Sequence, residues 1–253
     1  MSHAKSNDHH IVTLTGIGKT FGGVRVLGGV DFSVGPGQVH GLVGENGAGK
    51  STLMKILSGV YPVEEGTLLM DGESRSFSSP EDAQRRGIGM VFQEFSLVPT
   101  LSVAENVMLH QEPRTVLGLI DERATVSAAQ ALFAEMDVDI DVRKRMSDFG
   151  PAQWQLTEIA KSLAREVRLL ILDEPTSSLT RSESVILFDL ISRLTARGIG
   201  IVYISHRMEE ILQVCDHVTV LRDGQLVLSS PAAELTVQDI VVAVVGRASE
   251  DHF

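Results

Sequence analysis

A glycine-rich run at residues 44–52 has the composition and spacing of a phosphate-binding loop. It reads Gly-Glu-Asn-Gly-Ala-Gly-Lys-Ser-Thr and matches the pattern GxxxxGK[ST] in full. Glycines let the backbone curl so that successive N–H groups point at phosphate oxygens, and a helix starting near Lys50 adds its positive end. Lys50 would reach the β- and γ-phosphates, and the Ser51 hydroxyl would ligate Mg²⁺.

The run therefore predicts a site for ATP with Mg²⁺, since both the charge and the curled backbone suit a triphosphate. An ordinary glycine-rich turn is the alternative, but the run also follows an apolar strand and opens a helix, as phosphate binding requires. The predicted nucleotide contacts in the loop are Gly44, Glu45, Asn46, Gly47, Ala48, Gly49, Lys50, Ser51 and Thr52.

Two adjacent acidic residues form the second motif that could take part in catalysis. Four apolar residues at 169–172 run directly into Asp173 and Glu174. At the end of a buried strand, Asp173 would hold Mg²⁺ through water, and Glu174 would polarise the water that attacks the phosphate. Solvated carboxylates at a strand end are the alternative for an isolated pair. The phosphate-binding loop upstream favours the catalytic interpretation.

The segments that must position these residues alternate between short apolar strands and helices. We expect strands at 11–14, 30–34, 39–43, 66–70, 169–172, 199–204 and 218–221, and helices at 50–57, 121–136, 153–165, 181–196 and 208–214. Strands that are apolar throughout and separated by helices indicate a largely parallel α/β core. Residues 11–43 are expected to form short strands joined by turns, in a strand-rich edge of the domain that we expect to be antiparallel.

The helical pattern between about 94 and 165 predicts a helical subdomain inserted into one α/β domain that spans 11–247. Residues 1–10 are expected to be a disordered tail and 248–253 a second tail. Segments at 225–228 and 237–245 would close the domain. The apolar stretch 240–245 is expected to pack on the core as a terminal helix, with a membrane-surface patch as the alternative.

Composition narrows the range of partners. The chain has 22 Lys and Arg against 33 Asp and Glu, a formal net charge of −11. An acidic chain lacks the electrostatic footprint of a nucleic-acid-binding protein and a polybasic anchor for anionic lipid. No apolar run approaches the 18 or so residues needed to cross a bilayer. The single cysteine, Cys215, lies in an apolar setting and is expected to be a packed, inert thiol.

Three further motifs, in chain order, give the sequence its resemblance to ABC-type ATPases. They are Gln93 after Ile-Gly-Met-Val-Phe, the run Asp-Glu-Pro-Thr-Ser at 173–177, and His206 after Ile-Val-Tyr-Ile-Ser. The resemblance covers about residues 11–247 and implies the P-loop NTPase fold of the ABC type. Each motif alone is weak, because a lone Gln or His after a strand is more often structural; their order makes them specific.

The resemblance also implies roles. Gln93 would contact Mg²⁺ and the attacking water and sense a transmembrane partner, and His206 would bridge to the γ-phosphate. With Glu174, these two form the expected catalytic set, while Ser51, Gln93 and Asp173 form the expected metal set. Phe21 matches the aromatic residue that stacks on adenine. Residues 177–180 would form the loop that crosses to a second ATPase unit.

A finer resemblance points to sugar importers. Segments 43–52, 92–109, 204–211 and 218–224 resemble the ATPases of monosaccharide importers of the ribose, xylose and galactose type. Those proteins usually carry two ATPase halves, and this chain resembles the amino-terminal half. A natural single-domain protein and a fragment of a tandem ATPase both remain open. So does a cargo other than a sugar.

This resemblance implies a peripheral protein at the cytoplasmic face of the inner (plasma) membrane that couples ATP hydrolysis to monosaccharide import. The implied partners are transmembrane permease subunits and a second ATP-binding unit, in a homodimer or a heterodimer. A periplasmic sugar-binding protein would act indirectly, and nucleic acid is not expected.

The family's signature motif, normally LSGGQ, is altered here. Phe-Gly-Pro-Ala-Gln stands at 149–153, just before the expected helix 156–163. The family's serine, which donates to the γ-phosphate of the opposite subunit's ATP, is Gly150, and Pro151 lacks a backbone N–H. We expect this chain's own P-loop and acids to be intact and its contribution to a second site to be weakened. A neutral variation is the alternative.

Two rival functions follow from these observations. A soluble ABC ATPase acting on DNA or ribosomes would carry coiled-coil insertions or basic linkers, and this acidic chain shows neither. A regulatory ATP-binding module with little turnover is favoured only by the altered signature. Comparing ATP binding with multiple-turnover hydrolysis would separate it from a transport ATPase.

Overall fold

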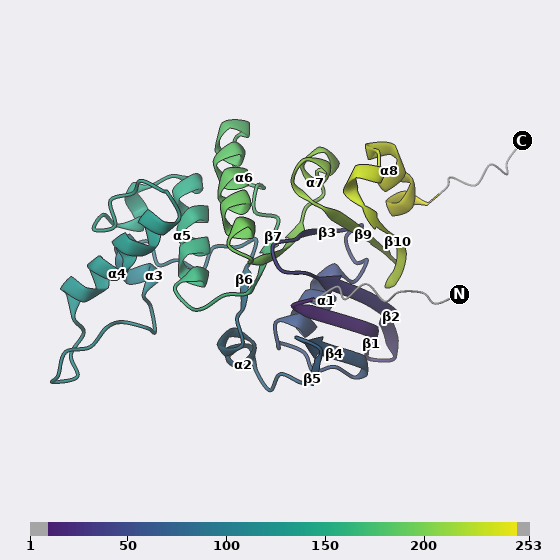
Figure 1. The fold of residues 1–253 in the computed structure, drawn as a ribbon, viewed down its shortest axis with the longest axis horizontal. Coiled ribbons are helices and arrows are strands. Elements are labelled where there is room, and N and C mark those ends of the chain that lie inside the picture. Colours follow the sequence, from purple (N-terminus) through teal and green to yellow (C-terminus); the bar gives the residue numbers. More distant parts are fainter. Residues whose placement is uncertain (1–9, 247–253) are drawn as a thin grey trace, which may run out of the picture.

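A computed structural model describes residues 10–246 of the 253-residue chain. The expected tails at 1–10 and 248–253 lie outside the described residues, except for His10. In the described part, the strands form two sheets, one of six strands and one of four. Helices cover the six-stranded sheet on both faces (Figure 1).

The six-stranded sheet is the expected parallel core. Its order is β10-β9-β3-β8-β7-β6, and each neighbouring pair from β9 to β6 is parallel, while β10 runs antiparallel to β9. Two of its strands, at 39–43 and 200–204, are buried along their whole length and, apart from His40, consist of glycine, aliphatic residues and Tyr203, because both sheet faces are covered. The strands are β3 (Val39–Val43), β6 (Ile88–Val91), β7 (Leu169–Asp173), β8 (Gly200–Ile204), β9 (His217–Arg222) and β10 (Gln225–Pro231).

The antiparallel strands form a sheet of their own, of order β2-β1-β4-β5. Its first two strands are longer than expected, because Gly16 at φ +62° makes a bulge inside β1 instead of ending it. A tight turn at Gly22-Gly23 then leads into the second strand. The strands are β1 (Val12–Phe21), β2 (Val24–Val34), β4 (Glu65–Met70) and β5 (Glu73–Arg75).

Two apolar cores lie on opposite faces of the parallel sheet. The buried face of α1 (Lys50–Leu57) packs in one core with residues of both sheets. This packing holds the helix in place directly after the phosphate-binding loop. The other core joins the opposite face of the parallel sheet to α6 (Arg181–Ala196), α7 (Met208–Val214) and α8 (Val237–Val245). In α8, Ile240 and Val244 are buried, which confirms packing of the terminal helix on the core.

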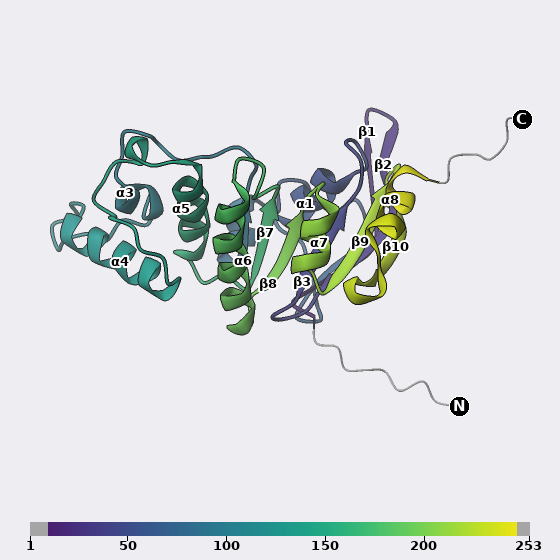
Figure 2. The same ribbon diagram turned by 90° about the horizontal axis from the view of Figure 1, so that it is seen from above.

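The helices between residues 103 and 163 gather at one end of the molecule, shown in teal in Figures 1 and 2. They are α3 (Val103–Val107), α4 (Glu122–Glu135), the short η1 (Met146–Asp148) and α5 (Pro151–Leu163). These helices fall within the expected 94–165 insertion, whose boundaries stay a prediction. The structure adds α2 (Pro80–Arg85) and η2 (Ala232–Glu234), which are too short for periodicity to reveal.

Two smaller expectations can also be compared with the structure. Cys215 is buried, and burial raises the pKa of its thiol, as expected for a packed and inert cysteine. Over residues 10–246, no helix is both long enough and apolar enough to cross a bilayer.

Candidate functional site

The phosphate-binding loop connects β3 to α1, and its glycines are required by its shape. Gly44 has φ +154°, and a Cβ there would lie 2.3 Å from the Leu221 carbonyl oxygen. Gly49 caps α1 in the left-handed region at φ +102°, and a Cβ there would lie 2.6 Å from Cδ2 of Leu27. Neither position accepts a side chain without movement of its neighbours. The backbone of residues 44–50 therefore forms a cradle at the amino-terminal end of a helix that is packed in the core, as phosphate binding requires. We call this loop the phosphate cradle.

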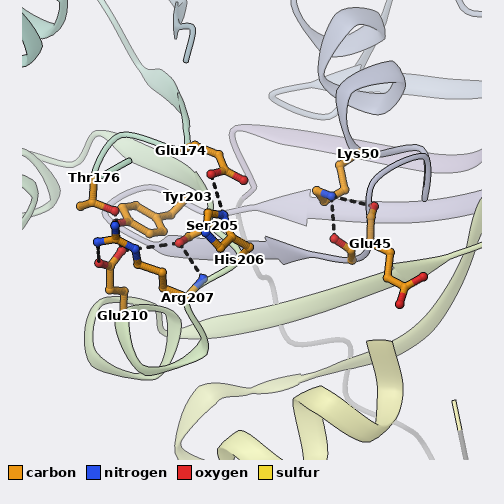
Figure 3. A network of polar contacts seen from close by, with 10 residues as sticks. Glu45, Lys50, Glu174, Thr176, Tyr203, Ser205, His206, Arg207 and Glu210 are labelled. Atoms are coloured by element: carbon orange, nitrogen blue, oxygen red, sulfur yellow. Dashed lines mark hydrogen bonds and ion pairs between the residues drawn. The ribbon is translucent and has the colours of Figure 1, made fainter. Parts of the chain in front are cut away.

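Lys50 is held inside this cradle. Its Nζ donates to the carbonyl oxygens of Gly44 at 2.6 Å and Glu45 at 2.9 Å (Figure 3). Burial lowers the pKa of the Lys50 ammonium, and the nearby charges of Glu174 and Asp173 partly offset that effect. The side chain is thus a fixed cation between the loop carbonyls and the acids at the end of β7.

The two acids lie where β7 leaves the sheet. Asp173 is the last residue of the strand and pairs with Ile204 of β8, and the backbone N–H of Glu174 donates to the Ile204 carbonyl at 2.9 Å. Glu174 has φ +49°, a left-handed conformation that is uncommon for a residue with a side chain. Burial, followed by the charge of Glu174, raises the pKa of Asp173, while Lys50 and Lys55 oppose that shift.

His206 follows the next strand, β8, and reaches the same place. Its Nδ1 lies 2.7 Å from Oε2 of Glu174 (Figure 3). The imidazole is 65% exposed, whereas the Glu174 side chain is only 19% exposed. The structure therefore brings together two of the three expected catalytic side chains at the carboxyl ends of neighbouring parallel strands, where open α/β sheets bind ligands.

Gln93, the third, follows β6 at the same edge of the sheet and is exposed. The segment after it is tied to α5, because the Glu158 carboxylate accepts from both the backbone N–H and the hydroxyl of Ser96. Lys161 of the same helix donates to the Ser96 hydroxyl at 2.9 Å. The expected contacts of Gln93 with Mg²⁺ and water stay a prediction.

The donor set suits Mg²⁺. Ser51 and Asp173 offer hard oxygen ligands, and magnesium is usually held by one or two carboxylates together with substrate phosphates. A divalent cation would also relieve the repulsion between Asp173 and Glu174 that contributes to the raised pKa of Asp173. Within residues 10–246 no cluster of three or more His, Cys, Asp or Glu could hold a metal alone. The residues present therefore fit a cation bound together with nucleotide.

A second aromatic residue packs against Phe21, the residue expected to stack on adenine. Phe21 ends β1 and is 39% exposed, and its ring packs edge-on against Tyr61 with centroids 5.2 Å apart. The Lys19 Nζ lies 5.3 Å from the Phe21 centroid and 5.4 Å from that of Tyr61. Tyr61 was missed because no motif contains it; its place shortly after the phosphate-binding helix was the only signal. Stacking of adenine on Phe21 stays a prediction.

The altered signature runs into the first turn of α5 and does not precede that helix, so the expected helix starts at 153 and 156 were two and five residues late. Gly150 is the N-cap, in an extended conformation with φ −89° and ψ 178°, and no side chain caps the helix. Pro151 occupies the first helical position, where its missing N–H has no helical partner in any case. Trp154 fixes the turn by donating from Nε1 to the carbonyl oxygens of Met146 and Phe149.

Comparison with known proteins gives one family and a set of close relatives. Residues 27–177 match the family described as ABC transporter. The chain is 47% identical over 243 residues to a ribose import ATP-binding protein, RbsA, of Burkholderia mallei, covering 96% of this chain and 48% of that protein. It is 44% identical over 252 residues to the galactose/methyl galactoside import ATP-binding protein MglA of Escherichia coli K12, covering 100% of this chain and 50% of that protein.

The fold has solved counterparts as well. A nucleotide-free ATP-binding cassette from an ABC transporter superposes with a TM-score of 0.82 at 23% identity, over 94% of this chain and 98% of that one. That similarity establishes the expected ABC-type α/β fold. The chain spans about half the length of the curated relatives it matches.

Proposed function

The chain belongs to the ABC transporter family, and we propose that it is the ATP-binding unit of a monosaccharide importer, hydrolysing ATP to drive transport through partner transmembrane subunits. The observation that carries this proposal is the edge shared by the phosphate cradle and the Glu174–His206 pair, joined at 2.7 Å. A site for binding alone would need the cradle, but it would have no use for a paired carboxylate and imidazole beside it.

In this proposal each side chain has one task. The backbone N–H groups of the loop and the Lys50 ammonium bind the phosphates, and Phe21 receives the adenine. Ser51 and Asp173 hold Mg²⁺, with Gln93 as the third expected ligand. The bound cation supplies charge neutralisation on the phosphates. Glu174 accepts the proton of the attacking water at its carboxylate, and His206 contacts the γ-phosphate and keeps Glu174 oriented.

The cargo and the partners are inferred from the relatives, whose names specify ribose and galactose import. We propose a monosaccharide cargo, a permease in the membrane and a second ATP-binding unit that completes the ATP site. A periplasmic sugar-binding protein would deliver the cargo. The chain would act from the cytoplasmic face of the membrane.

Uptake of labelled ribose and galactose tests this function in cells that lack the gene for the protein containing this chain. Restoring the wild-type gene should restore uptake of at least one monosaccharide, while genes carrying Lys50→Ala or Glu174→Gln should not. Equal uptake with Glu174→Gln would contradict ATP-driven import by this site. Unchanged uptake of every monosaccharide after gene deletion would point to a different cargo, such as a non-sugar solute.

A second candidate is a regulatory ATP-binding module with little turnover. The observation that favours it is the signature turn, where Gly150 offers no hydroxyl and Pro151 offers no N–H. ATP binding without multiple-turnover hydrolysis, even in the assembled complex, would support this second function over the first.

A further inference from the structure

The Glu210 carboxylate is the centre of a half-buried polar network beside the candidate site. Glu210 lies in the first turns of α7, four residues after His206, and its side chain is 13% exposed. Its Oε2 accepts from the Thr176 hydroxyl at 2.6 Å and from the Tyr203 hydroxyl at 3.1 Å (Figure 3). Burial, followed by the charge of Glu210, raises the pKa of Tyr203, so the phenol stays a donor.

The same carboxylate fixes both neighbours of His206. Its Oε1 accepts from Nη1 of Arg207 at 3.0 Å, and its Oε2 lies 3.5 Å from the Ser205 hydroxyl oxygen. Ser205 in turn accepts from the Arg207 backbone N–H at 3.1 Å. Residues 205 and 207 are therefore both bonded to one side chain, and His206 is the residue held between them.

The contact with Thr176 extends this network to the other half of the pair. Thr176 lies two residues after Glu174, in the segment that leaves β7, and it is buried. One carboxylate thus bonds the segment that carries Glu174 and the segment that carries His206. A buried charge is unfavourable unless it is paired and hydrogen-bonded, so a network of this kind is better suited to fixing positions than to adding stability.

We propose that Glu210 is a positioning residue, which holds the His206 segment against the Glu174 segment so that both groups face the γ-phosphate together. This inference depends on the proposed function, because it assigns Glu210 to the hydrolysis step. Substitution of Glu210 should therefore change the rate of hydrolysis and the Glu174–His206 contact, and leave nucleotide affinity nearly unchanged.

Glu210→Gln tests this with little change of shape. An amide leaves one oxygen to accept and puts an NH₂ group where the carboxylate accepted from Thr176 or Arg207. We expect kcat to fall about tenfold to hundredfold, as for a small misplacement of catalytic groups, with KM and the stoichiometry of ATP binding within about twofold of wild type. Glu209→Gln, at the exposed neighbouring position on the same helix, is the matched control and should keep wild-type kcat.

Thr176→Val isolates the link to the Glu174 segment. The double variant of Thr176→Val and Glu210→Gln should lose less kcat than the sum of the two single losses, because both substitutions break the same network. Additive losses would show that Glu210 does not act through Thr176. A kcat equal to wild type in Glu210→Gln would overturn the positioning role. So would a decrease in kcat that is fully explained by a smaller fraction of the protein binding ATP.

A spectroscopic measurement keeps this inference separate from the proposed function. The ¹⁵N resonances of the His206 imidazole report its contact with Glu174, whether or not the protein turns ATP over. In Glu210→Gln they should shift in the same direction as in Glu174→Gln, and in Glu209→Gln they should not move. Unmoved resonances in Glu210→Gln would refute the inference. Absence of hydrolysis by the wild-type protein in every assembly would instead refute the proposed function.

Discussion

Nδ1 of His206 and Oε2 of Glu174 lie 2.7 Å apart, although the two residues follow different strands of the parallel sheet. β7 and β8 are neighbours in register, so the residues that follow them emerge side by side. The Glu174 backbone N–H bonds the last residue of β8, which fixes the two strand ends to each other. The contact therefore follows from the strand order and needs no flexible loop to bring the groups together.

Lys50→Ala is expected to weaken ATP binding severalfold or more. The substitution removes the one side-chain charge held in the phosphate cradle, while the loop backbone keeps its shape. Titration calorimetry on the folded variant provides the measurement, and Lys144→Ala, at an exposed lysine within the helical region 94–165, is the control. Unchanged affinity in Lys50→Ala would show that the nucleotide binds elsewhere.

Asp173→Asn is expected to stabilise the nucleotide-free protein at pH 7. Burial and Glu174 raise the pKa of Asp173 above its ordinary 3.8, so the folded state binds this proton more tightly than the unfolded state. Stability contributed by this group therefore falls as the pH rises from about 4 through the raised pKa, and the charged form is unfavourable at pH 7. Removing the charge should therefore raise the free energy of unfolding, measured in urea.

Asp189→Asn is the control for this substitution, because Asp189 is exposed on α6. The Asp173 variant should also lose the dependence of ATP binding on Mg²⁺, whereas the control should keep it. Equal stability changes in both variants would contradict an unfavourable charge at Asp173.

Restoring the signature should speed hydrolysis by the isolated protein. A Cβ at Gly150 would meet only Oε1 of Gln153, at 3.6 Å, so Gly150→Ser with Pro151→Gly and Ala152→Gly fits the turn sterically. A hydroxyl bonded to phosphate contributes ~1.5–3 kcal/mol, which corresponds to about a tenfold to hundredfold gain in rate. The same variant with Gly150→Ala separates the hydroxyl from the backbone changes. A restored protein that dimerises but turns over no faster would make the altered signature neutral.

Because of His40, the free energy of unfolding is expected to decrease in acid. Its ring joins the Ser33 carbonyl on β2 to the Thr219 hydroxyl on β9, at 2.7 and 2.8 Å. Burial, followed by the charge of His217, lowers the pKa of His40 from 6.5 to about 3. The unfolded chain therefore binds the extra proton between these values, and stability falls as the pH drops below 6.5.

At pH 5 the expected loss from His40 is about 2 kcal/mol relative to pH 8. Urea unfolding of wild type and His40→Gln across this range measures it, since the variant should show the shallower pH dependence. Parallel curves for the two proteins would mean that other groups carry the acid sensitivity.

The sequence predicted the parts of the site that lie close together along the chain. Residues 44–52 and the pair Asp173-Glu174 are contiguous, so their expected chemistry can be inferred without a fold. Glu209 and Glu210 show the limit of this approach. They are identical in type and adjacent, yet Glu209 is exposed, and Glu210 bonds residues on β8 and after β7. Only the packing of α7 distinguishes them.

The strands near the amino terminus show a second limit. The expected strands 11–14 and 30–34 stop short of Gly16 and of the pair Gly28-Gly29, respectively. In the structure these glycines lie inside β1 and β2, at shifts in the strand register, and Gly16 and Gly29 have positive φ values. Pairing of β1 with both β2 and β4 overrides the local preference of glycine for turns.

Single-turnover hydrolysis of ATP by wild type and Glu174→Gln, with Mg²⁺ and a partner ATP-binding unit present, tests the central claim most directly. The amide keeps the shape of Glu174 but cannot take the proton of the attacking water. The account predicts unchanged ATP affinity and a rate about 10²–10⁴-fold lower in the variant, with ATP trapped in a closed dimer. Hydrolysis at the wild-type rate by Glu174→Gln would show that the base lies elsewhere and would contradict the account.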